Sequence, residues 1–136
     1  MPTRRVHTDI LIQVAEDLAL ENVLGQFSEE QDQDNLLLVS GPFDYELAAA
    51  ATDVQIAFPG GVTNLRFLAV MKVTVATGLQ ITFDNSANDP FLISAPSGTG
   101  LEGQLVITTN ASSLYIDNPS ATTAVGFTML MGFANS

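Results

Sequence analysis

The stretch NLRFLAVMKVTVA, residues 64–76, decides the fold of this 136-residue chain. It is long, rich in β-branched residues and apolar on both alternating faces, which is typical of a strand covered on both sides. A break follows at Thr77-Gly78. The sequence therefore predicts a central strand of a β-protein. One face would carry Leu65, Phe67, Ala69, Met71, Val73 and Val75, and the other Arg66, Leu68, Val70, Lys72 and Thr74.

Shorter strands are expected on both sides of this stretch. Turn-forming segments such as DNSANDP and DNPSATT separate them. About nine or ten strands at a spacing of roughly 8–12 residues predict an all-β sandwich of the jelly-roll kind. The alanines at 48–51 also allow a helical turn, and Gly41-Pro42 is expected to end a strand. The expected strands are residues 36–40, 43–51, 54–58, 79–83, 91–95, 104–109, 113–116 and 125–133.

The N-terminal part of the chain is less regular. Residues 1–9 (MPTRRVHTD) have no periodic pattern, so they are expected to form an extended N-terminal arm or a frayed terminus. Residues 10–15 suit a strand, and residues 16–24 suit a short helical or extended piece. Residues 26–35 (QFSEEQDQDN) are expected to be a polar acidic loop. Behind the arm, residues 10–136 have the length of a single domain.

Charge in the chain is scarce and acidic. Charged residues make up 14%, hydrophobic residues 46%, and the formal net charge is −11. A chain so poor in charge is expected to hide surface in a homo-oligomer, a dimer or trimer, or on a partner. It lacks the cluster of basic residues that binding to nucleic acid or to an anionic membrane requires. The longest apolar stretch, residues 124–134, is about half of the roughly 20 residues that a spanning helix needs.

Few residues could support catalysis. The last 64 residues, 73–136, contain no lysine, arginine, histidine or cysteine. His7 is the single histidine, so a catalytic triad or a histidine metal site would have to use it. The acids gather in expected loops, where no carboxyl group should acquire the raised pKa of a glycoside-hydrolase acid. The sequence therefore predicts a protein that is not an enzyme and holds no metal and no cofactor.

Two binding alternatives stay open. Residues 32–35 (DQDN) and 84–89 (DNSAND) place oxygen ligands at a spacing that calcium could use. Neither segment fits an EF-hand loop, and Asx-rich turns commonly cap backbone groups instead. Tyr45, Tyr115 and the eight phenylalanines could stack on sugars, although alternating positions favour the core for most of them.

The chain resembles small β-sandwich structural proteins of tailed bacteriophages, notably capsid decoration (cement) proteins. The resemblance is carried by the segment 1–9, by NLRFLAVMKVTVA, and by LQITFDN (79–85) and SLYIDNP (113–119). The hydrophobic end AVGFTMLMGFA and the small, cysteine-free, acidic composition add to it. The likeness lies in architecture and composition over the whole chain, and it carries over no individual functional residue.

The resemblance implies a virion structural protein on the capsid surface, which binds the major capsid protein across its junctions and stabilises the shell. Arginines in an arm could pair with an acidic shell surface. The alternative is a tail-fibre or baseplate module that recognises carbohydrate. The residues expected to contact the capsid are Arg4, Arg5, Val6 and His7, and those expected to pack an oligomer interface are Phe127, Met129, Met131 and Phe133.

Overall fold

The described part of the computed structural model, residues 3–15, 23–98 and 100–135, forms ten strands and contains no helix. All strand pairs are antiparallel. This confirms the all-β prediction. The strands are β1 (Arg4–Ala15), β2 (Val23–Leu36), β3 (Leu38–Leu47), β4 (Val54–Gln55), β5 (Asn64–Val73), β6 (Leu79–Phe83), β7 (Phe91–Ile93), β8 (Gly103–Ala111), β9 (Leu114–Asp117) and β10 (Val125–Ala134).

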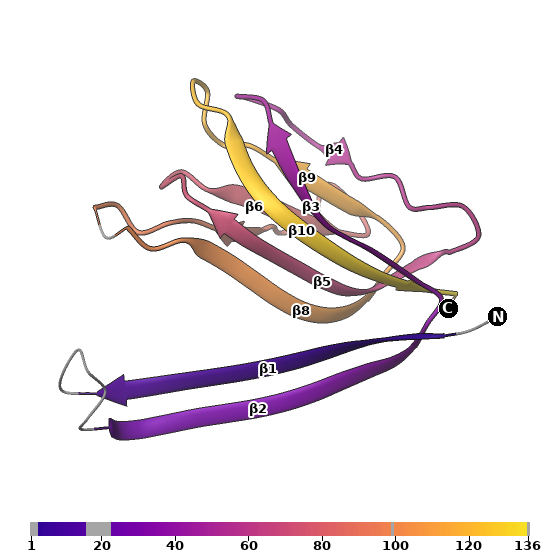
Figure 1. Cartoon of the computed structure of the whole chain (residues 1–136). Coiled ribbons are helices and arrows are strands. Elements are labelled where there is room, and N and C mark those ends of the chain that lie inside the picture. The colour runs from indigo at the N-terminus through magenta and orange to yellow at the C-terminus, as the bar shows by residue number, and fades with distance from the viewer. Residues whose placement is uncertain (1–2, 16–22, 99, 136) are drawn as a thin grey trace.

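Two four-stranded sheets form the body of the protein (Figure 1). One has the strand order β3-β10-β5-β8 and the other β4-β9-β6-β7. Apolar side chains from both sheets make one core, and aromatic contacts such as the edge-on pair Phe58–Phe133, with ring centroids 5.0 Å apart, extend it. The architecture is consistent with a β-sandwich. Fully buried core residues include Leu65, Leu68, Val70, Val73, Leu79, Ile81, Leu114, Val125, Met129 and Phe133.

Strand β5 lies inside its sheet, between β10 and β8, as the stretch 64–76 predicted. The predicted division of its faces was wrong. Register shifts interrupt the alternation of β5, against β10 between Leu65 and Phe67 and against β8 between Val70 and Val73. A shift of one residue moves the following side chains to the other face of a sheet. Phe67 therefore leaves the sandwich core and lies on the outer surface of the sheet, where it is still 4% exposed.

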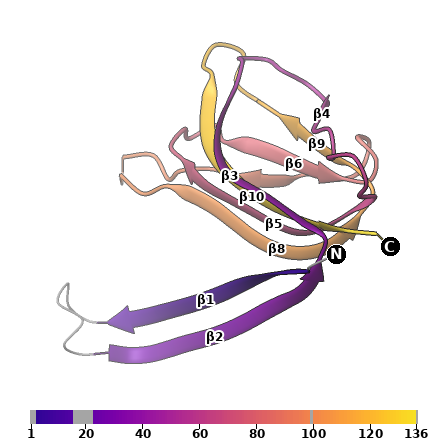
Figure 2. The same cartoon turned by 45° about the vertical axis from the view of Figure 1, so that its right-hand side comes forward.

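The N-terminal region is a long β-hairpin, which we call the hairpin, made of β1 and β2 alone. It runs alongside β8 in both views and joins β3 near the C-terminus (Figures 1 and 2). Residues 26–35, expected to be a loop, form most of β2, and residues 4–9, expected to be an arm, begin β1. The helical or extended piece expected at 16–24 lies mostly outside the described residues.

Candidate functional site

The hairpin carries two chemically different faces. Side chains alternate along a strand, and residues opposite one another in register share a face. We call the two sets the outer face and the inner face. The outer face holds Arg5, His7, Asp9, Leu11 and Gln13 of β1 with Gln26, Ser28, Glu30, Asp32 and Asp34 of β2. The inner face holds Val6, Thr8, Ile10 and Ile12 with Glu29, Gln31 and Gln33.

An ionic network crosses the outer face near the base of the hairpin. Arg5 bonds Asp34 through Nε, and its guanidinium lies 3.8 Å from Asp32 Oδ2. His7 Nδ1 lies 2.7 Å from Asp32 Oδ1. The His7–Asp32 hydrogen bond raises the pKa of the histidine above its ordinary value and lowers the pKa of the Asp32 carboxyl. These groups are all solvated, so the network orders the hairpin more than it stabilises the whole protein.

The four residues expected to contact a capsid therefore divide between several roles. Arg5 and His7 belong to the ionic network, where acids of the same chain partly neutralise them. Arg4 donates from its guanidinium to the Leu37 carbonyl, with an N–O distance of 3.2 Å. Val6 lies half-buried on the inner face. The structure brings the four residues together at the base of the hairpin, and a capsid contact through them stays a prediction.

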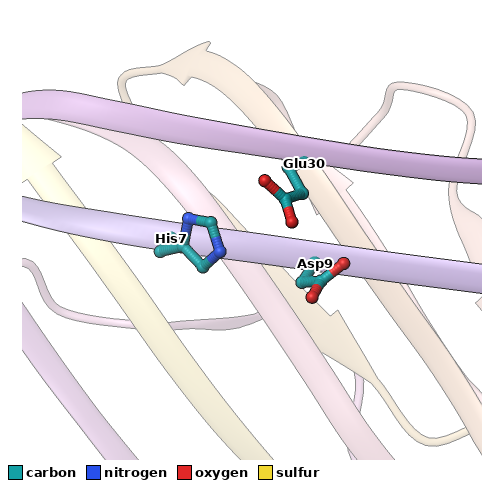
Figure 3. Close-up of side chains that lie close together, drawn as sticks. All are labelled: His7, Asp9 and Glu30. Atoms are coloured by element: carbon teal, nitrogen blue, oxygen red, sulfur yellow. The ribbon is translucent and has the colours of Figure 1, made fainter.

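His7, Asp9 and Glu30 form the closest group of metal-ligating side chains among the described residues (Figure 3). One ligand atom from each lies within 4.8 Å of the others, and all three are exposed. A histidine with two carboxylates could hold a divalent transition metal. On a chain with a net charge of −11, however, exposed acids also gather without any ion. The cluster therefore does not by itself define a metal site.

The two Asx-rich segments are engaged in bonds within the chain. Asp32 and Asp34 lie on β2 and face Arg5 and His7. In the turn after β6, Asp84 Oδ1 accepts a hydrogen bond from the Ser112 backbone N–H at 2.7 Å. Such bonds satisfy loop backbone groups and correspond to the capping interpretation of these segments.

A groove separates the inner face of the hairpin from the sandwich. Its volume is about 290 Å³. The hairpin lines it with Thr8, Ile10, Glu29 and Gln31, and the sheet lines it with Phe67, Val106, Ile107 and Thr108. Towards the tip of the hairpin, Leu11 and Ile12 are 57% and 56% exposed. The hairpin thus presents apolar side chains that its own chain covers only in part.

The base of the hairpin is where it contacts the body. Leu36 is 1% exposed, and its methyl groups lie so close to Gly132 that a Cβ there would meet one of them at 2.8 Å. Gln33 Nε2 donates to the Arg66 carbonyl at 3.0 Å, whereas Gln33 Oε1 is buried without a hydrogen-bond partner among the described residues. The sequence analysis missed this anchor because it expected residues 26–35 to be a loop. The signal that could have indicated the hairpin lies in its first strand, where β-branched residues alternate at positions 6, 8, 10 and 12.

The C-terminal strand β10 packs inward. The side chains of Phe127, Met129, Met131 and Phe133 are at most 3% exposed and belong to the sandwich core. Phe127 also stacks on Tyr45, with ring centroids 5.6 Å apart. Because the core occupies these four side chains, a subunit interface on this strand would have to use other residues.

Comparison with known proteins gives no match among family models, curated proteins or solved structures. Within the described residues, no helix has the length and apolar character needed to cross a membrane.

Proposed function

We propose that this chain is a non-enzymatic virion structural protein of the capsid decoration kind, built on a jelly roll and attached to the shell through its N-terminal hairpin. The observation that carries the proposal is the nesting of the strand pairs. The eight strands of the body pair from the two ends of the chain segment towards its middle. β3 pairs with β10, β4 with β9, β5 with β8, and β6 with β7.

Nested antiparallel pairs of this kind arise when one long double-stranded ribbon rolls into two four-stranded sheets. That arrangement of eight strands is the jelly roll, which recurs in viral capsid proteins and lectins. A fold supports many functions, so the fold alone does not give the role. What favours a structural role is the use of the buried polar groups. Among the described residues, Asn118 and Ser120 use their buried polar groups in hydrogen bonds that hold loops, and Thr82 is buried on β6.

The hairpin supports attachment in place of the arm expected from the sequence. It extends from the body as a separate two-stranded sheet, and strands of this length span about 40 Å. Leu11 and Ile12 stand exposed towards its tip. Leu11 lies on the outer face and Ile12 on the inner face, so a partner that encloses the hairpin would bury both, and full burial of each contributes about 1.5–3 kcal/mol. Arg4, Arg5, Val6 and His7 would add contacts at the base.

The test is co-sedimentation of the pure protein with capsids from its source. The full chain should bind saturably, and the double variant Leu11→Ser/Ile12→Ser should lose that binding. Leu101→Ser is the matched control, because Leu101 is 63% exposed but lies in the loop before β8. Equal binding by all three proteins would refute attachment through the hairpin. Absence of binding by the full chain would refute the decoration role.

A further inference from the structure

The hairpin is an incomplete structural unit within its own chain. It is a two-stranded sheet, and within the described residues neither outer edge pairs with a third strand. A two-stranded sheet is marginally stable in water unless it packs on another element. Here the packing is closest at the base, where Leu36 is 1% exposed, and a groove of about 290 Å³ remains between part of the inner face and the sandwich.

We propose that the inner face of the hairpin of one copy docks on the outer surface of β5 and β8 of a second copy. That docking surface consists of Phe67, Val106 and Thr108, and the hairpin residues opposite it are Thr8 and Ile10. The chain already lays these two surfaces side by side. Because every copy carries both surfaces, exchanging the hairpin between copies would reuse the same contacts. Such an exchange is a low-cost route to an oligomer.

The connection between the hairpin and the body favours exchange. β2 ends at Leu36 and β3 begins at Leu38, so a single residue joins the two units. Just before it, Asn35 has a φ of 62°, in the left-handed region that asparagine adopts more readily than most residues, so the chain turns sharply there. Short hinge connectors favour the swapping of an element between chains. The buried and unpaired Gln33 Oε1 is a second sign that the base is not fully satisfied within one chain.

Charge indicates a second copy as the partner. The chain has a net charge of −11, and acids crowd the outer face of the hairpin. Among the described residues of the inner face, Glu29 is the only acid, and the groove residues of β5 and β8 are uncharged. Two acidic copies can therefore meet through these surfaces while the acids stay in solvent. The proposal goes beyond capsid attachment and does not depend on it.

Because the chain contains no cysteine, paired single substitutions give a direct test. One preparation carries Ile10→Cys with a size tag, and the other carries Val106→Cys without a tag. The two are mixed, unfolded, refolded together and oxidised mildly. A mixed disulfide can form only between chains, and docking should hold the thiols together. At about 10 μM protein, an effective concentration on the order of millimolar predicts cross-linking about a hundredfold faster than by random collision.

The matched control is Asp9→Cys mixed with Val106→Cys, because Asp9 lies one residue away on the outer face. It should cross-link at the collision rate. Thr8→Cys with Thr108→Cys is a second docking pair, milder in size, in case Ile10→Cys disturbs folding. Light scattering of the unmodified chain should give the mass of at least two 14.4 kDa chains. A monomer mass, or docking pairs no faster than the control, would overturn the proposal and leave capsid binding a separate question.

Discussion

Replacing Asn118 with alanine should remove hydrogen bonds that join the two sheets of the sandwich and so lower the free energy of unfolding. Asn118 follows β9 in one sheet and is 3% exposed. Its side-chain amide donates to the carbonyls of Leu47 and Ala48, at the end of β3, and of Thr123, just before β10. Since β3 and β10 belong to the other sheet, one side chain joins the ends of three strands across the sandwich.

The size of the effect follows from these distances. The Nδ2–O distances are 2.8 Å to Thr123, 3.1 Å to Ala48 and 3.3 Å to Leu47, while Oδ1 accepts from the Ser120 N–H at 3.0 Å. An amide has two N–H groups, so two of the three carbonyls must share one donor. About three effective hydrogen bonds at roughly 1 kcal/mol each give a loss of about 3 kcal/mol.

The assay is urea unfolding followed by circular dichroism, supported by thermal melting. At about 4 °C per kcal/mol for a chain of this size, the midpoint should fall by roughly 12 °C. The control is Asn110→Ala, because the Asn110 Oδ1 accepts an exposed hydrogen bond from Asn64 Nδ2 at 3.0 Å. It should lower the free energy of unfolding by under about 1 kcal/mol. Equal losses in the two variants would refute the assignment of a sheet-joining role to Asn118.

Two further predictions concern the hairpin and the core. The His7–Asp32 pair should stabilise the hairpin fully only below the ordinary histidine pKa of 6.5, and this contribution is lost as pH rises through the raised pKa. The Asp32 contribution is fully present above pH 3.8, the ordinary pKa of its carboxyl, and is lost as the pH falls through the lowered pKa. NMR titration should show that the pKa of His7 falls in the variant Asp32→Asn. An unchanged pKa would contradict the pairing. Met129→Ala, at a site with no exposed surface, should cost about 2–5 kcal/mol in urea unfolding. Leu130→Ala, half-buried on the outer surface, should cost less, and the reverse order would mean that β10 faces the other way.

The sandwich could be predicted from the sequence because its strands alternate around one core. The strand expected at 79–83 has the bounds of β6, and that expected at 125–133 lacks only the last residue of β10. Gly41-Pro42 was expected to end a strand, but β3 runs through it. Proline is tolerated there because β3 is an edge strand, where a missing N–H breaks no ladder. Bulges in β5 could not be predicted, since they depend on the register with β10 and β8.

The second strand of the hairpin was harder to predict because residues 28–35 (SEEQDQDN) are all polar. Both faces of a two-stranded sheet are largely solvated, so apolar alternation, the usual signal of a strand, is weak there. In residues 30–34 (EQDQD), however, acids and amides alternate with the period of two that a strand requires. In the structure the acids Glu30, Asp32 and Asp34 occupy the outer face, and Gln31 and Gln33 face the sandwich.

The alternation of charge therefore carries information that the alternation of hydrophobicity does not. In a strand with both faces in solvent, acids are expected on either face. Here three successive outer-face positions of β2 are acids, and Arg5 and His7 partly neutralise them on that same face. The inner face, by contrast, bears a single acid, Glu29, among its described residues. Such segregation favours a hairpin whose inner face meets protein, and the mixed cysteine experiment asks whether that protein is a second copy of this chain.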